Sequence, residues 1–306
     1  MADLAGLLRG AVAGERLALA RLLTAIEDDA PGLRKLLPEL FGAGRGGQLV
    51  GITGPPGSGK STLVNALTEE WRRRGRRVGI VAIDPSSPYT GGAIMGDRVR
   101  MMEHAADRHV FMRSMASRGE LGGLAATTWT AAAALDAGGF DPILIETVGA
   151  GQSEVEIARL AETTVVVEVP EMGDEVQAIK AGLLEVADVI AVNKADRPGA
   201  QQAARQLRAM MSTAGGRVRR QPPKIIMTTA VSGEGVPALV DEIEAHRREG
   251  QSSEQAHERA RHQIRRALSD VVGRRAAASA AWDATVDAVA RREMDPFTAA
   301  EGLLDR

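Results

Sequence analysis

The pattern of hydrophobic and polar positions changes twice along the chain. In residues 1–45, apolar side chains recur near helical spacing, as at Leu22 and Ile26, and Gly and Pro interrupt the pattern. Residues 46–248 contain short apolar runs that are separated by helical stretches. From residue 249 to 306 the chain first turns polar and then resumes helical periodicity, without any strand-like run. The chain therefore reads as a central region with a helical segment on each side.

The apolar runs of the central region have the character of buried β-strands. They are nearly continuous rather than alternating in polarity, which is typical of strands covered on both faces. Helical stretches between them indicate crossover connections, so we predict an α/β fold with a mostly parallel central sheet and helices on both faces. The runs are Leu49–Thr53, Val78–Asp84, His109–Met112, Pro142–Glu146, Thr163–Val169, Val189–Asn193 and Lys224–Thr229.

The first run leads directly into a segment that matches the phosphate-loop pattern G-x-x-x-x-G-K-[ST]. A strand before it and a helix-forming stretch after it are the context that this loop requires. Its glycines allow backbone N–H groups to surround phosphates, and the helix N-terminus adds a favourable dipole. Lys60 would neutralise phosphate oxygens, and the Ser61 hydroxyl would reach Mg²⁺. The predicted nucleotide-binding residues of this loop are Gly54, Pro55, Pro56, Gly57, Ser58, Gly59, Lys60, Ser61 and Thr62.

Three carboxylates are candidates for holding the metal ion beside this loop. Glu146 ends a predicted strand and begins an E-x-x-G spacing that resembles the D-x-x-G segment of GTPases. Asp84 also ends a strand, where open α/β sheets bind ligands, but it could instead cap the turn that follows. Asp97 lies in a Gly-rich stretch and could reach the metal from a loop. Together with Ser61, these three residues are the predicted metal ligands.

A later run ends in Asn193–Asp196, which matches the pattern N-K-x-D. The Asp196 carboxylate can accept hydrogen bonds from both N1–H and the N2 amine of guanine, an arrangement that adenine does not offer. Asn193 would brace the loop and Lys194 would lie along the base, so we predict GTP rather than ATP as the nucleotide. The segment after the last run either closes over the guanine through backbone groups or is an ordinary strand end. It comprises Thr229, Ala230 and Val231.

The order of these motifs resembles a specific family. The strings GPPGSGKST, IDPSS, TGGAIMGDRVRM, ETVGAGQSE, EMGDEVQAIKAG and NKAD resemble the MeaB/ArgK-type GTPases, which accompany adenosylcobalamin-dependent methylmalonyl-CoA mutase and related acyl-CoA mutases. The resemblance extends over residues 10–245 and is weaker in the tail. It implies a P-loop NTPase G domain over residues 46–248, an N-terminal helical extension over 1–45 and a C-terminal helical arm over 249–306. The arm would serve either in dimerisation or as a lid.

The resemblance also implies a function. Proteins of this family bind the mutase, gate the loading of its cofactor and protect it from inactivation, as homodimers with slow GTPase activity of their own. It implies bound GTP or GDP with Mg²⁺, no directly bound cobalamin, and the cobalamin adenosyltransferase as a further partner. The family pattern would make Asp84, Asp97 and Glu146 the magnesium-side carboxylates.

Hydrolysis is expected to be slow without a partner. Many fast GTPases orient the attacking water with a Gln directly after the switch Gly, but Ala150 follows Gly149 here. Gln177 and Lys180 match polar positions that the family is proposed to swing towards the nucleotide when the partner is bound. We therefore predict Lys60, Gln177 and Lys180 as catalytic residues, although Lys180 could instead be a solvated helix residue.

Composition and charge exclude several other classes of function. The chain of 306 residues has no Cys, which excludes disulfides, thiol nucleophiles and zinc–thiolate sites. Its net charge of −2 argues against a chain-wide nucleic-acid surface. The basic run Arg72–Arg77 lacks interleaved aromatic residues, so we interpret it as a solvated helix end. No apolar run approaches the roughly 20 residues of a membrane span, so we expect a cytoplasmic protein that binds neither nucleic acid nor membrane.

Two alternative functions share part of the pattern. A GTPase that inserts nickel into a hydrogenase or urease usually carries a His-rich tract or metal-binding Cys, and this chain has neither. An ATP-dependent kinase of a transport system would not need the guanine-reading N-K-x-D segment. Both alternatives therefore rank below the mutase-associated GTPase.

Overall fold

The computed structural model describes most of the chain in two compact units. The described residues are 3–84, 104, 106–116, 123–147, 157, 159–170, 186–213, 222–250 and 253–305. The larger unit spans Met1–Gln255 and the smaller one Ala256–Arg306. Asp97, Gln177 and Lys180 lie outside the described residues, and so does Ala150.

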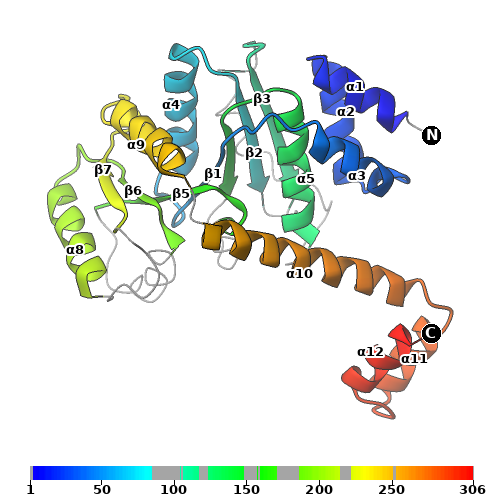
Figure 1. Cartoon of the computed structure of the whole chain (residues 1–306). Coiled ribbons are helices and arrows are strands. Elements are labelled where there is room, and N and C mark those ends of the chain that lie inside the picture. Colours follow the sequence, from blue (N-terminus) through cyan, green and yellow to red (C-terminus); the bar gives the residue numbers. More distant parts are fainter. Residues whose placement is uncertain are drawn as a thin grey trace. The chain divides into compact units, whose positions relative to one another are not determined.

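A parallel sheet forms the centre of the larger unit (Figure 1). Its strand order is β3-β2-β4-β1-β5-β6-β7, and every neighbouring pair runs parallel. The strands are β1 (Leu49–Thr53), β2 (Val78–Asp84), β3 (Val110–Ala116), β4 (Ile143–Thr147), β5 (Thr163–Glu168), β6 (Val189–Val192) and β7 (Lys224–Met227). Because β1 lies between β4 and β5, the loop that follows it begins at the centre of the carboxyl end of the sheet.

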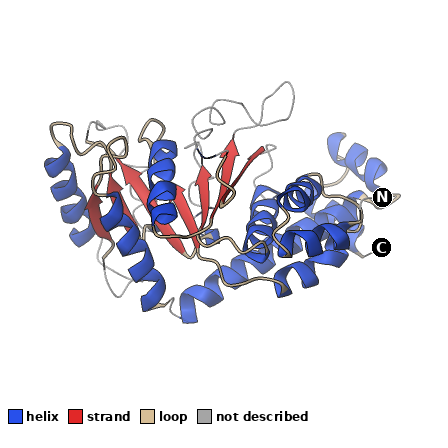
Figure 2. Ribbon diagram, turned by 90° about the horizontal axis from the view of Figure 1, so that it is seen from above, coloured by secondary structure: helices blue, strands red, loops and turns tan. Residues whose placement is uncertain are grey.

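Helices cover both faces of this sheet (Figure 2). Helices α4 (Lys60–Arg73) and α9 (Val236–Glu249) share a buried apolar cluster with one face of the strands. Helices α5 (Gly123–Ala137) and α8 (Ala200–Thr213) pack on the other face. Successive strand residues point to opposite faces, so a continuous apolar run is what a sheet covered on both sides requires. The predicted fold class is confirmed.

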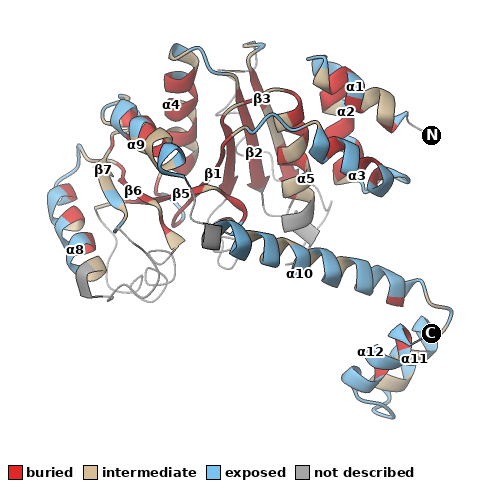
Figure 3. Ribbon diagram, in the orientation of Figure 1, coloured by how far each residue is buried: buried red, intermediate tan, exposed pale blue. Residues whose placement is uncertain are grey.

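The N-terminal helices pack onto the same core. Helices α1 (Leu4–Val12), α2 (Arg16–Glu27) and α3 (Leu33–Gly42) share one buried cluster with α5 and the sheet. Leu22 and Leu40 are fully buried in it, and Figure 3 shows the buried sides of these helices together with the buried strands. The N-terminal segment therefore gains its stability from the sheet domain rather than from a core of its own.

The smaller unit is helical. It contains most of α10 (Ser253–Ala277), together with α11 (Trp282–Ala290) and α12 (Pro296–Leu304), of which α11 and α12 contact each other. Large apolar side chains of α10 are exposed at Ile264, Leu268, Val271 and Val272. Their spacing places them on one side of the helix. Among the described residues, no helix is both long and apolar enough to cross a bilayer.

The basic run after α4 differs from its sequence interpretation. Arg72 donates to the Asp107 carboxylate at 2.7 Å and Arg74 donates to Asp241 of α9 at 2.7 Å, and both arginines are only about a quarter exposed. The hydrogen bond from Arg72 holds the pKa of Asp107 below its ordinary value. The prediction of a solvated helix end is therefore wrong for these two arginines, because carboxylates on neighbouring segments bind them.

Replacing Leu22 by Ala tests the packing of the N-terminal helices. Leu22 has no exposed surface, so we expect Leu22→Ala to lower the free energy of unfolding by about 2–5 kcal/mol. The matched control is Leu17→Ala on the same helix, where the side chain is 64% exposed and the change should stay within about 0.5 kcal/mol. Urea denaturation followed by circular dichroism measures both. Equal effects of the two substitutions would contradict the packing described.

Candidate functional site

The loop between β1 and α4 has a backbone that only glycine permits at two points. Gly54 has a φ of +142°, and a Cβ there would lie 2.2 Å from the carbonyl oxygen of Val167 on β5. Gly59 has a φ of +87°, and a Cβ would lie 2.6 Å from the side-chain nitrogen of Asn193. A side chain at either position would push the loop away from the neighbouring segments. The glycines of the motif thus allow the loop to pack closely on β5 and on the base motif.

Lys60, the first residue of α4, places its ammonium group inside this loop. Its Nζ donates hydrogen bonds to the carbonyl oxygens of Gly54 at 2.8 Å and Pro55 at 3.0 Å. The residue is only 6% exposed, which a charged side chain tolerates when hydrogen bonds compensate for lost hydration. The first backbone N–H groups of an α-helix have no acceptor within the helix itself, so the start of α4 favours an anion beside Lys60. The loop therefore combines a fixed cation with a helix N-terminus, the arrangement that binds phosphate.

Ser61 and Glu146 meet at the carboxyl end of the sheet. The Ser61 hydroxyl donates to Oε1 of Glu146 at 2.5 Å, and Glu146 is 3% exposed. Glu146 belongs to β4, where it pairs in register with Ile52 of β1. A hydroxyl and a carboxylate are hard oxygen ligands and fit Mg²⁺, which usually keeps several water and phosphate ligands as well. Among the described residues, no cluster of three or more His, Asp or Glu side chains could hold a metal by itself.

The other two predicted carboxylates contribute less to the described geometry. Asp84 ends β2, beside β4 at the same end of the sheet, but only its backbone is described. Asp97 lies outside the described residues, as do the predicted catalytic residues Gln177 and Lys180. Their roles stay predictions. The geometry brings together Lys60, Ser61 and Glu146.

Asn193 connects the base motif to the phosphate loop. Its side-chain Nδ2 donates to the carbonyl oxygen of Ser58 at 2.9 Å, and its Oδ1 accepts from the backbone N–H of Ala230 at 3.1 Å. Lys194 has a φ of +56° and donates from Nζ to the carbonyl oxygen of Gly57 at 2.8 Å. The segments after β1, β6 and β7, which are far apart in sequence, are thus held together by side chains of the N-K-x-D motif.

The remaining predicted base-site residues lie around this junction. Asp196 is exposed in the turn that follows β6. Thr229 pairs through its backbone with Glu234, and its neighbour Val231 is 90% exposed. Ala230 is buried against Asn193. Asp196 and Val231 are therefore exposed, and they lie in the two segments that the buried Asn193 side chain connects.

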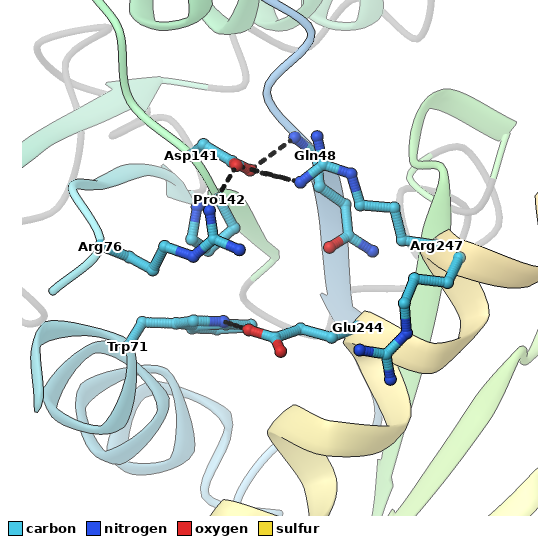
Figure 4. Close-up of a pocket in the computed structure, with 8 residues that line it drawn as sticks. Gln48, Trp71, Arg76, Asp141, Pro142, Glu244 and Arg247 are labelled. Carbon is cyan, nitrogen blue, oxygen red and sulfur yellow. Dashed lines mark hydrogen bonds and ion pairs between the residues drawn. The ribbon is translucent and has the colours of Figure 1, made fainter. Parts of the chain in front are cut away.

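A cavity of about 320 Å³ lies at the opposite, amino end of the sheet (Figure 4). The Asp141 carboxylate accepts hydrogen bonds there from the backbone of Gln48 and from Arg76 and Arg247. Trp71 Nε1 donates to Glu244 at 3.2 Å, and Arg74 forms an ion pair with Glu244 at 3.5 Å. These partners already neutralise both carboxylates. We assign the cavity a structural role, because its polar groups join the starts of strands to α4 and α9.

Comparison with known proteins agrees with this geometry. The family described as methylmalonyl Co-A mutase-associated GTPase MeaB matches residues 19–284. A Pyrococcus abyssi protein whose name classes it as a GTPase is 42% identical over 301 residues, covering 95% of this chain and 93% of that protein. The Mus musculus protein named methylmalonic aciduria type A homolog, mitochondrial, is 36% identical over 250 residues, covering 76% of this chain and 60% of that protein.

A solved structure matches the chain along its whole length. The crystal structure of a LAO/AO transport system kinase superposes with a TM-score of 0.68 and 26% sequence identity. The match covers 100% of this chain and 98% of that one. The fold of this chain is therefore similar to that of a protein of known structure.

Replacing Asn193 by Ala tests the brace between the two motifs. The substitution leaves the Ser58 carbonyl and the Ala230 N–H unpaired in a buried place, so the free energy of unfolding should fall by about 1–3 kcal/mol. Lys194→Ala is the control, because it removes an exposed hydrogen bond and should cost less than about 1 kcal/mol. Urea denaturation without nucleotide measures both. If Asn193→Ala cost no more than the control, the brace would not be supported.

Proposed function

Because the chain belongs to the MeaB family of methylmalonyl-CoA mutase-associated GTPases, we propose that it hydrolyses GTP in the service of an adenosylcobalamin-dependent acyl-CoA mutase. The observation that carries the proposal is the junction at Asn193. Its side chain joins a phosphate loop, which contains Lys60, to a guanine-reading motif, which contains Asp196. A nucleotide bound along this junction would have its phosphates and its base held by segments that are fixed relative to each other.

The residues at the carboxyl end divide the chemistry among them. Lys60 and the first N–H groups of α4 stabilise the charge that spreads over the γ-phosphate oxygens during in-line attack by water. Ser61 and Glu146 would hold Mg²⁺, and Asp84 and Asp97 would complete the magnesium side of the site. When bound, Mg²⁺ supplies further neutralisation of phosphate charge.

Slow hydrolysis without a partner follows from the sequence after β4. Ala150 stands where many GTPases place a water-orienting Gln, and it has no group that could do so. We propose that binding of the mutase brings Gln177 and Lys180 to the nucleotide. Hydrolysis would then depend on the state of the mutase, which allows GTP to gate cofactor loading and to protect the mutase from inactivation. The cobalamin adenosyltransferase is a further partner on this account.

We also propose that the chain acts as a homodimer. The exposed apolar residues Ile264, Leu268, Val271 and Val272 lie on one side of α10, and Trp282 and Val286 of α11 are exposed as well. Exposed apolar side chains that gather on one helix face mark interaction sites. A helical arm that pairs with a second copy would cover it.

Asp196→Asn tests the choice of nucleotide. The wild-type chain should bind GDP at least about a hundredfold tighter than ADP, because a polar site built for one base leaves buried groups unpaired with another. Asp196→Asn replaces a charged double acceptor and should weaken GDP binding at least about tenfold. Isothermal titration calorimetry measures both, with the exposed Asp283→Asn of α11 as a control that leaves affinity unchanged. Tight binding of ADP or ATP would favour the kinase alternative.

Retention of a purified mutase tests the proposed partner. We expect the chain to retain an adenosylcobalamin-dependent acyl-CoA mutase in a pull-down whose yield depends on the bound nucleotide. Single-turnover GTP hydrolysis should accelerate with the mutase, and Lys180→Ala should lose about tenfold or more of that acceleration. Lys35→Ala, which removes an exposed lysine of α3, should keep it.

The hydrolysis assay and the pull-down test two separate claims, the role of Lys180 and the partnership with the mutase. An unchanged acceleration in Lys180→Ala would remove the role of Lys180 and leave the partnership intact. A chain that binds GDP but neither retains the mutase nor responds to it would contradict the proposed function.

A further inference from the structure

Arginines gather around a small cleft at the amino end of the sheet, on the side away from the phosphate loop. The cleft has a volume of about 20 Å³, enough for about one water-sized group, and Arg16, Arg77 and Arg108 are among its lining residues. Arg45 lies next to Arg77. Within the described part of the chain, no ion pair joins any of these four arginines to a carboxylate.

Aromatic rings hold two of the guanidinium groups in place. Arg16 lies over the Phe111 ring, with its Cζ 5.0 Å from the ring centroid. Arg77 lies over the Phe140 ring at 4.4 Å. The two rings pack edge to face, with centroids 6.0 Å apart. A stacked guanidinium keeps the N–H groups in its plane available to acceptors, so the two arginines present donors in fixed directions.

Backbone carbonyls occupy only part of this donor capacity. Arg16 donates from Nη1 to the carbonyl oxygen of Val110 at 2.6 Å, and Arg77 donates from Nη1 to Gly138 at 3.1 Å. A guanidinium has five N–H donors. Neutral carbonyls also leave the charge of each arginine uncompensated.

The arginines repel one another in the absence of an anion. Both guanidinium groups lie close to Gly139. A Cβ on Gly139 would be 2.9 Å from Nη1 of Arg45 and 3.1 Å from Nη1 of Arg77, so the two arginines are close neighbours. Burial and the nearby charge of Arg45 lower the pKa of Arg77. An anion between such groups would convert repulsion into attraction.

Nearby carboxylates do not supply that anion. Glu15 lines the cleft, but no ion pair within the described residues joins it to the arginines. Asp136 is occupied by backbone N–H groups, since it accepts from Arg45 at 3.1 Å and from Gly47 at 2.7 Å. The cleft therefore keeps an excess of positive charge.

We propose that this cleft binds the phosphate group of a small anion. Forked guanidinium donors that converge from several segments match the several oxygens of a phosphate dianion. A monocarboxylate would leave most of the positive charge uncompensated. The small volume admits only part of a phosphate group, so the rest of the ion, and the remainder of any ester, would stay at the mouth of the cleft.

Titration with inorganic phosphate tests the proposal. Isothermal titration calorimetry is performed on the chain saturated with GDP and Mg²⁺, so that the phosphate loop is filled, and on Lys60→Ala, in which that loop is impaired. We expect one phosphate per chain in both. Arg16→Gln and Arg77→Gln should each weaken this binding about tenfold or more, since each removes a charged hydrogen-bond donor. Arg248→Gln, an exposed arginine of α9 outside the cleft, should change it less than about twofold.

A conservative substitution and titrations with other anions identify the ligand and keep the proposal testable if a variant fails to fold. Arg77→Lys retains the charge without the fork, and it should bind phosphate more weakly than wild type even if Arg77→Gln fails to fold. Glycerol 3-phosphate that binds as well as phosphate would identify phosphomonoesters as the ligands, whereas binding of phosphate alone would identify the free ion. Equal affinity in all arginine variants, equally tight binding of acetate, or no binding by the wild type would overturn the proposal.

Discussion

The side-chain amide of Asn193 is the contact on which the candidate site depends. It is buried, and it donates to the phosphate loop at Ser58 while accepting from Ala230 after β7. A nucleotide has its charge at one end and its base at the other, so a site that reads both needs the two loops at a fixed separation. One amide with both a donor and an acceptor fixes three loops at once, and an alanine there could fix none of them.

The parallel sheet determines where that contact can form. All strands of the sheet end on the same side, so the segment after β1, the end of β4 and the segment after β6 gather there with Lys60, Ser61 and Glu146. The starts of the strands gather at the opposite end, and the two cavities there are lined by arginines, carboxylates and aromatic rings among other residues. The two ends of one sheet therefore offer different chemistry, an oxygen-ligand and nucleotide site at one and a positively charged cleft at the other.

The sequence predicted most strands and the phosphate loop because continuous apolar runs and glycine motifs are local signals. It missed the second half of β3, which extends to Ala116, because Arg113 and Ser114 interrupt the apolar run. Arg113 is tolerated there because β3 is an edge strand and Glu27 of α2 pairs with it. Contacts between distant segments carried no local signal, so neither the Asn193 junction nor the arginine cleft could be assembled from spacing alone. The ion pairs of Arg72 and Arg74 escaped prediction for the same reason.

A crystal structure with Mg²⁺ and a non-hydrolysable GTP analogue tests the central claim most directly. The account predicts the γ-phosphate beside the ammonium group of Lys60 and the metal on the Ser61 hydroxyl with Glu146 next to it. It also predicts the N1 and N2 edge of guanine on Asp196, with the Asn193 contacts unchanged. A nucleotide bound elsewhere on the chain, or a base recognised by groups other than Asp196, would contradict it.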